Sequence, residues 1–260
     1  MAAIHGEVMD GVAWLKVDNA SKRNAMTLAM WRAIPHWMTQ FEANPDVRVV
    51  MLTGAGNQAF ISGADISEFA QVRSTPEDVE AYESAVRSAE TAIRDSALPT
   101  VAAVNGLCYG GGLGLAGSCD LRYAARSARF RMPAARLGLG YGMTGVKAFL
   151  ELLGPSSLKE VFFMGEPFDA ERARQIGFVN QVFDDETFAE DAARLAETIA
   201  SNAPLTLRAL KRTIRAINTP DDARQQEEAL QAIQACFDSA DYKEGQLAFA
   251  QKRRPVFQGR

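Results

Sequence analysis

The stretch VAAVNGLCYGGG, residues 101–112, decides how this chain folds. It lies in a run from Thr100 to Asn105 that follows Pro99 and is typical of a buried strand. A glycine-rich bend comes next, and then a short apolar segment that ends at Ser118. Three consecutive glycines expose backbone N–H groups at the expected start of a helix, where the helix dipole favours negative charge. The stretch therefore has the features of an oxyanion hole.

A second loop of small residues follows another strand-like run, in FISGADI at residues 60–66. One N–H from Gly63-Ala64 and one from the three glycines would place two donors around a single oxygen. Such a pair stabilises an enolate oxygen by roughly 3 to 4 kcal/mol per donor in related chemistry. Taken alone, the residues are equally compatible with tight turns under close packing.

Strands and helices alternate on both sides of these loops. Apolar alternation predicts strands over Glu7–Val17 and Val47–Thr53, with a helix of about Thr27–Glu42 between them. The sequence TPED begins at Thr75 with an N-cap, a proline and an acidic residue three positions on, which predicts a helix to about Arg94. From about residue 185 the pattern is helical only, over Glu186–Ile199, Leu205–Ile217, Asp221–Phe237 and Asp241–Gln251. The sequence predicts an α/β fold with a helical C-terminal section.

The composition and charge of the chain disfavour some classes of binding partner. The chain has 260 residues, 47% of them hydrophobic, and a formal net charge of −4, so it offers no broad cationic field for nucleic acid or anionic lipid. The N-terminus has no signal peptide pattern, and no apolar run is long enough to span a membrane. Three scattered cysteines are too few for a disulfide framework. We therefore expect a cytoplasmic protein with no nucleic-acid or membrane partner.

Several common catalytic motifs are absent or lack their context. GLGLAG at residues 112–117 matches a dinucleotide-binding fingerprint, but Leu121–Leu150 contains no Asp or Glu to bind a ribose. The two histidines, His5 and His36, have no nucleophile elbow beside them. No metal-binding motif occurs, so we expect no bound metal. Hydride transfer, serine hydrolysis and metal chemistry are disfavoured.

A series of motifs, in order along the chain, resembles the enoyl-CoA hydratase/isomerase (crotonase) family. They are SGADISEF at 62–69, AAVNGLCYGGG at 102–112, CDLRYA at 119–124, FRMP at 130–133 and EGQLAFAQKRRPVFQG at 244–259. The resemblance extends over nearly the whole chain. It implies a spiral of ββα units that holds the acyl-CoA site, over residues 1–200, and a helical oligomerisation section over 201–260. It further implies a homotrimer or a dimer of trimers.

The resemblance also assigns site residues. Family members bind acyl-CoA thioesters with the thioester oxygen in an oxyanion hole, which corresponds here to the backbone N–H groups of Ala64 and Gly111. Coenzyme A then belongs to the substrate, and no permanently bound cofactor is expected.

Four residues are assigned to the coenzyme by the same resemblance. Arg23, Asp65 and Ile66 would lie near the bent coenzyme A, and Lys252, from a neighbouring subunit, would approach a phosphate. The plainer alternatives are that Asp65 only caps the following helix and that Lys252 is a solvated charge.

The sequence departs from the family's hydratases at two positions. Those enzymes hold a water molecule between two glutamates, and the corresponding residues here are Gly114 and Ala134. Adding water to a conjugated double bond needs a base and an acid, each typically worth about 10²- to 10⁴-fold. Since Leu121–Leu150 contains six basic residues and no acidic one, no neighbour in the sequence replaces them. The usual hydratase mechanism is therefore in doubt.

Tyr141 offers a different chemistry. Its position resembles that of a tyrosine in the methylmalonyl-CoA decarboxylases of the superfamily, although Ala64 stands where those enzymes carry a histidine. Decarboxylation needs no general base, because loss of carbon dioxide itself generates the enolate. Packing of the Tyr141 ring on the loop glycines is an equal alternative. Three hypotheses remain: a hydratase or isomerase with its acid/base elsewhere, a Tyr141-assisted decarboxylase-like enzyme, and a non-catalytic acyl-CoA-binding relative.

Overall fold

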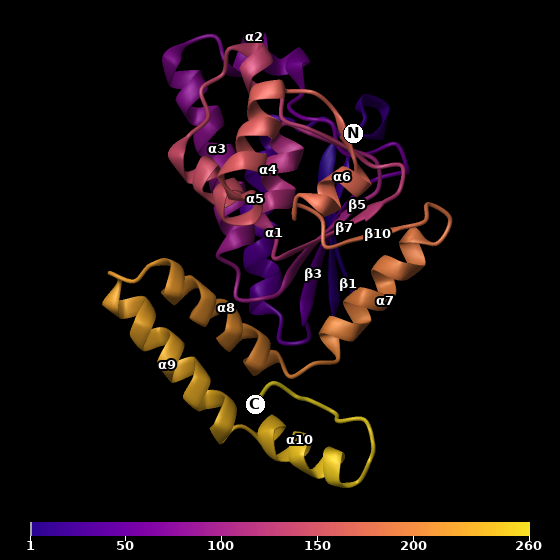
Figure 1. Cartoon of the computed structure of the whole chain (residues 1–260), viewed down its shortest axis with the longest axis vertical. Helices are drawn as coiled ribbons and strands as arrows, with labels where there is room; N and C mark the ends of the chain where they lie inside the picture. The colour runs from indigo at the N-terminus through magenta and orange to yellow at the C-terminus, as the bar shows by residue number, and fades with distance from the viewer. Residues whose placement is uncertain (1) are drawn as a thin grey trace.

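The computed structural model describes residues 2–260, and two sheets form its centre (Figure 1). The larger sheet has six strands in the order β1-β2-β3-β5-β7-β10. Its β1 and β2 are antiparallel, and the other neighbours are parallel. The bounds are β1 Ala3–Met9, β2 Val12–Asp18, β3 Val49–Gly54, β5 Thr100–Val104, β7 Leu121–Ala125 and β10 Gln181–Phe183.

Strands of the smaller sheet follow strands of the larger sheet along the chain. Its four strands have the order β4-β6-β8-β9, and their bounds are β4 Ala59–Ile61, β6 Leu107–Tyr109, β8 Arg129–Arg131 and β9 Phe168–Asp169. The chain leaves a strand of the larger sheet, enters one of the smaller sheet and then forms a helix. This happens for β3 and β4, for β5 and β6, and for β7 and β8. The predicted spiral of ββα units is confirmed.

The first predicted strand was wrong in one respect. The segment Glu7–Val17 is not one strand but parts of two, because β1 and β2 form a hairpin with Asp10 and Gly11 at its turn. Both turn residues have positive φ, 50° and 79°, as a two-residue hairpin turn of the primed type requires. Apolar residues alternate on both sides of this turn, so the alternation alone did not reveal it.

Helices cover the sheets where the sequence predicts them. Thr27 caps α1, and Thr75 and Asp78 form a complete capping box at the start of α3, with Pro76 in the first turn. The α3 helix packs against both α1 and α4. The bounds are α1 Leu28–Ala43, α2 Phe69–Val72, α3 Pro76–Arg94, α4 Gly111–Ser118, α5 Met143–Met164 and α6 Ala170–Gln175. Three short 3-10 turns are η1 Ala20–Lys22, η2 Ile66–Glu68 and η3 Ala134–Leu137.

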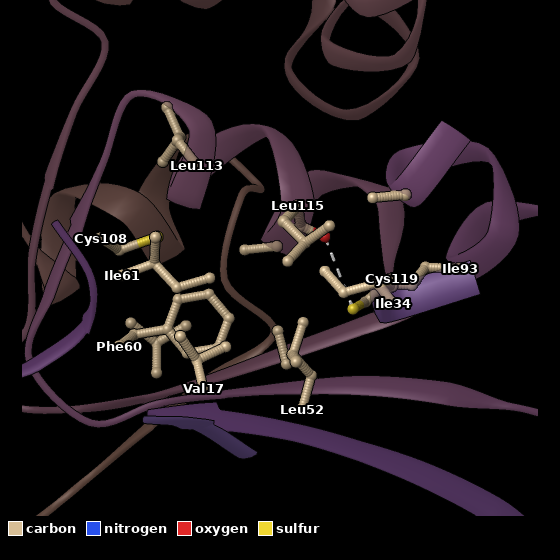
Figure 2. Close-up of a cluster of buried hydrophobic side chains, with 14 of the residues drawn as sticks. Val17, Ile34, Leu52, Phe60, Ile61, Ile93, Cys108, Leu113, Leu115 and Cys119 are labelled. Carbon is tan, nitrogen blue, oxygen red and sulfur yellow. Dashed lines mark hydrogen bonds between the residues drawn. The ribbon is translucent and has the colours of Figure 1, made fainter. Parts of the chain in front are cut away.

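The main hydrophobic core lies between the larger sheet and the helices α1, α3 and α4. Figure 2 shows Leu52 of β3 and Phe60 of β4 facing Leu115 of α4 across this space. Burying side chains of this size stabilises the fold by about 1.5 to 3 kcal/mol each. The core thereby fixes the start of α4 against the strands that precede it.

The last helices extend away from the sheets. In Figure 1 α8, α9 and α10 form an arm at the lower end of the molecule. The helix bounds in this part are α7 Phe188–Ala200, α8 Pro204–Asn218, α9 Ala223–Asp238 and α10 Ala240–Ala250. Large apolar side chains on the arm are exposed, with Ile217 at 68% and Phe249 at 88%. An exposed apolar surface of this kind suits contact with another chain, and the trimer stays a prediction.

In the part of the chain from residue 2 onward, none of the helices combines the length and apolar character needed to cross a bilayer.

Candidate active site

Two loops lie at the carboxyl ends of neighbouring parallel strands. Ile61 of β4 is opposite Cys108 of β6, so the residues that follow each strand emerge at the same edge of the sheet. A Cβ on Gly112 would come within 2.4 Å of the carbonyl oxygen of Ile61. Only glycine allows α4 to begin this close to β4. The fold thus brings the loops that hold Ala64 and Gly111 together, as the sequence predicts.

Both loops present a backbone N–H that has no acceptor. The N–H of Met26 donates to the carbonyl of Gly63 at 2.8 Å, and the N–H of Asp65 donates to the carbonyl of Met26 at 2.8 Å. Extended backbone alternates in direction, so the N–H of Ala64 points away from Met26. Gly111 is the first residue of α4, where an N–H has no intrahelical acceptor. Within residues 2–260 neither of these two N–H groups donates a hydrogen bond.

The electrostatics at this edge favour negative charge. Gly111 begins a helix, so the positive end of the α4 dipole faces the loop. Gly110, just before it, has φ 53° and ψ −115°, a conformation that costs little only for glycine. Two free donors and a helix N-terminus match what a developing oxyanion needs. The catalytic roles of Ala64 and Gly111 stay predictions.

Trp31 packs against the start of α4, and Tyr82 holds the indole ring in place. A Cβ on Gly111 would lie 3.0 Å from Cζ2 of Trp31, so the indole ring packs directly on this glycine. The indole Nε1–H donates to the Tyr82 hydroxyl at 3.0 Å, and both side chains are buried. Arg73 lies over the Tyr82 ring, 4.2 Å from its centroid. This stack holds Gly111 in place.

The residues predicted to bind coenzyme A surround the Ala64 loop. The carbonyl of Arg23 accepts from the N–H of Ser62 at 3.2 Å, and Ile66 is 76% exposed beside the loop. The carboxylate of Asp65 accepts from Nζ of Lys22 at 2.7 Å and caps η2.

The Asp65 carboxylate is engaged within the chain itself. Burial raises the pKa of Asp65, but the hydrogen bonds from Lys22 and Ser67 outweigh that effect and lower it below 3.8. The structure therefore shows the capping alternative for Asp65, and a role toward coenzyme A stays a prediction.

Lys252 does not join these residues within one chain. It follows α10, which Figure 1 places at the opposite end of the molecule from α2. Any contact between Lys252 and the loops must come from a neighbouring chain. That is the arrangement that the sequence resemblance implies.

A carboxylate that the sequence did not assign lies at Gly114. A Cβ on Gly114 would be 2.4 Å from Oε1 of Glu90 and 3.2 Å from the hydroxyl oxygen of Tyr141. Glu90 comes from α3, so the sequence around Gly114 gives no sign of it. One signal was present: the buried residues of α3 include Tyr82, Ala89 and Ile93, and Glu90 is a charged residue at the edge of that apolar stripe.

The surroundings of Glu90 perturb its ionisation. Burial raises its pKa to about 7, against a lowering effect of Arg94 and a further raising effect of Glu83. Such a group exchanges protons near neutral pH. Ala134 is buried in η3 and offers no ionisable group at the second glutamate position.

Tyr141 lies in the same place. Its ring packs edge-on against Phe149 and Phe162, at centroid distances of 6.2 and 5.1 Å. It also covers Gly145, whose Cβ would be 2.5 Å from Cε1. Burial raises the pKa of the hydroxyl above 10.0, so Tyr141 is protonated at neutral pH. The ring thus packs on α5, at Gly145, Phe149 and Phe162, and among residues 2–260 no contact with the loop glycines is seen. The hydroxyl faces Gly114, and its catalytic role stays a prediction.

Comparisons with known proteins agree with the sequence resemblance. The family model described as enoyl-CoA hydratase/isomerase matches residues 7–260. The chain is 31% identical to a short-chain-enoyl-CoA hydratase of Clostridium acetobutylicum, covering 94% of this chain and 92% of that protein. It is 34% identical to a carnitinyl-CoA dehydratase of Citrobacter koseri, covering 85% of each. The crystal structure of an enoyl-CoA hydratase/carnithine racemase from Magnetospirillum magneticum matches with a TM-score of 0.94 at 33% identity, covering 100% and 97% of the two chains.

Proposed function

Because the chain belongs to the enoyl-CoA hydratase/isomerase family, we propose that it binds an acyl-CoA thioester and stabilises its enolate with the N–H groups of Ala64 and Gly111. One observation carries this proposal. Two backbone N–H groups without acceptors lie at the carboxyl ends of adjacent strands, one of them at a helix N-terminus. A thioester oxygen placed between them receives both hydrogen bonds.

Enolate formation is where such a pair acts most strongly. The thioester oxygen gains negative charge as a proton or a carboxyl group leaves the α-carbon. Each donor then contributes roughly 3 to 4 kcal/mol to the transition state. Because the strands and the core already fix both donors, little reorganisation is needed when the charge develops.

The reaction follows from what adjoins this oxygen. Gly114 and Ala134 supply no carboxylate, so the water-activating pair of the family's hydratases is missing. The proposal is a hydratase- or isomerase-type enzyme whose proton-transfer group comes from outside those two positions. A decarboxylase-like reaction is the second candidate, favoured by the Tyr141 hydroxyl that faces Gly114.

The rest of the coenzyme fits the exterior of the Ala64 loop. The carbonyl of Arg23 accepts from Ser62 of this loop, and Ile66 beside the loop is exposed, so both are available to the coenzyme. Lys252 of a neighbouring subunit supplies a phosphate contact in a homotrimer or a dimer of trimers. Coenzyme A enters and leaves as part of the substrate, and the proposal requires no permanently bound cofactor.

The test uses mass spectrometry in deuterated water. Crotonyl-CoA, 3-butenoyl-CoA and methylmalonyl-CoA are incubated with the protein and with the Gly111→Val variant. We expect deuterium uptake or double-bond migration with the enoyl thioesters and loss of both in the variant. Loss of carbon dioxide from methylmalonyl-CoA would select the decarboxylase-like reaction instead. Binding of all three thioesters without any change in mass or in the position of the double bond would refute an enzymatic role and leave a binding protein.

A second readout does not depend on a variant or on turnover. Acetoacetyl-CoA forms an enolate that absorbs in the near ultraviolet. The proposal predicts that its pKa on the protein falls below that of the free thioester by at least about 2, since the donors together contribute several kcal/mol. An unchanged pKa of bound acetoacetyl-CoA would refute the oxyanion hole.

A further inference from the structure

The geometry points to Glu90 of α3 as the group that exchanges a proton with the carbon skeleton of the bound thioester. The carboxyl group of Glu90 occupies the space beside Gly114 that a side chain at this position of α4 would otherwise fill. This inference rests on the proposed function and adds the catalytic acid/base that the function lacks. It assigns the chemistry to a residue from a helix remote in sequence from both loops.

The position of Glu90 relative to the oxyanion hole follows from helix geometry. Gly111 and Gly114 are three residues apart in α4, so they share one face and differ by about 4.5 Å along the axis. Glu90 Oε1 lies 2.4 Å from where the Cβ of Gly114 would be. The carboxyl group is therefore about one helical turn from the Gly111 N–H.

The carboxyl group of Glu90 is half-buried and has no partner in the part of the chain that the structure describes. Two other acidic residues of α3 are paired: Glu80 with Arg87, and Glu83 with Arg73. Across residues 2–260 no hydrogen bond or ion pair reaches the carboxyl group of Glu90. Even partial burial of a carboxyl group that lacks a partner has a free-energy cost. A role toward a ligand accounts for a carboxyl group in this place.

Glu90 also borders a cavity. The space has a volume of about 10 Å³ and is lined by Glu90, Gly114, Tyr141, Gly145 and Phe149 among others. Arg94 and Ser118 also line it, beside glycines and aromatic rings, so its walls are of mixed polarity. The carboxyl group of Glu90 and the hydroxyl of Tyr141 are its polar features facing Gly114.

Gly114 and Glu90 depend on each other. Any side chain at position 114 would collide with the carboxylate, so the glycine is what admits Glu90 to this place. The lack of a glutamate at position 114 therefore goes together with the carboxylate that α3 places there. The site keeps a carboxylate at this point of α4 but takes it from another helix.

The proton transfer balances without any further reactant. The Glu90 carboxylate takes a proton from the α-carbon of a 3-enoyl thioester, and the electron pair of the broken C–H bond moves onto the thioester oxygen between Ala64 and Gly111. The carboxylic acid then returns the proton to the γ-carbon, which gives the 2-enoyl thioester, or to the α-carbon, which gives exchange with solvent. The charged or titratable groups around Glu90 are Arg94 and Glu83 on α3 and the neutral Tyr141 hydroxyl, and its pKa of about 7 suits both steps.

The test compares Glu90→Gln with Glu80→Gln, which removes an exposed, ion-paired carboxylate of the same helix. We measure isomerisation of 3-butenoyl-CoA, deuterium exchange and the ionisation of bound acetoacetyl-CoA. Glu90→Gln is expected to lower isomerisation and exchange by about 100-fold or more and to leave the acetoacetyl-CoA ionisation unchanged. The wild-type pH profile should have an inflection near pH 7 that the variant lacks. Glu80→Gln should match the wild type.

The outcomes separate the two proposals. A Glu90→Gln rate within threefold of the wild type, with acetoacetyl-CoA still ionised on the protein, overturns the role of Glu90 and leaves the oxyanion hole intact. Failure of the wild type to ionise acetoacetyl-CoA overturns the proposed function itself. If Glu90→Gln does not fold, Gly114→Ala serves as the second variant, because its added methyl group displaces the carboxylate without removing it.

Discussion

Replacing Glu90 by glutamine should stabilise the protein at alkaline pH. The pKa of Glu90 in the folded chain is raised from 4.5 to about 7. Below pH 4.5 the residue is protonated in both the folded and the unfolded chain, so its burial carries no electrostatic cost. As the pH rises through 7, the folded state must hold a half-buried charge that the unfolded chain exposes fully to water. The wild type therefore loses stability as the pH increases.

The size of this loss follows from the pKa difference. One pKa unit corresponds to about 1.4 kcal/mol, so a rise from 4.5 to about 7 costs roughly 3 kcal/mol at high pH. Glutamine has nearly the same shape and never carries the charge. The free energy of unfolding of Glu90→Gln should exceed that of the wild type by about 1 kcal/mol near pH 5 and about 3 kcal/mol near pH 8.5.

The assay is urea unfolding at fixed protomer concentration, since any assembly makes stability depend on concentration. Glu80→Gln is the matched control, and loss of its exposed ion pair should change stability by no more than about 1 kcal/mol at either pH. A Glu90→Gln advantage that is the same at both pH values would refute the reasoning. It would mean that the carboxylate reaches water in the folded protein.

Three further predictions concern Gly114, Tyr141 and Lys252. Gly114→Ala should abolish isomerisation because its methyl group displaces Glu90. The control is Gly117→Ala, whose Cβ would be 3.5 Å from Phe149. It should stay active, and its free energy of unfolding in urea should rise by up to about 1 kcal/mol. Tyr141→Phe keeps the ring packing and removes the hydroxyl that faces Gly114, so steady-state turnover should fall more than tenfold, about 1.4 kcal/mol; an unchanged rate would leave that residue with packing alone. Lys252→Ala should raise KM for the thioester by about 2- to 5-fold at constant kcat, and by less at high salt, as expected for an exposed phosphate contact. Unchanged KM at low salt would place that lysine in solvent.

Local patterns determined much of the fold. The capping box and the apolar stripe set the bounds of Pro76–Arg94, since these signals depend on neighbours three and four residues apart. The glycines at 110–112 predicted the start of α4 and its free N–H groups. The sequence did not predict the hairpin turn at Asp10-Gly11, because the apolar alternation continues on both sides of it. Period-two patterns identify strands but not where one strand ends and the next begins.

The candidate site likewise has parts that the sequence predicted and one part that only the structure revealed. The sequence by itself determined the two loops that hold Ala64 and Gly111, because each follows a recognisable strand and has residues that only a tight turn requires. Only the tertiary structure decided that Glu90 faces Gly114. That contact depends on how α3 packs on α4 after the spiral has brought them together. Pairing between elements distant in sequence is set by sheet register and core packing, and no periodicity within either helix records which residue of one meets which residue of the other.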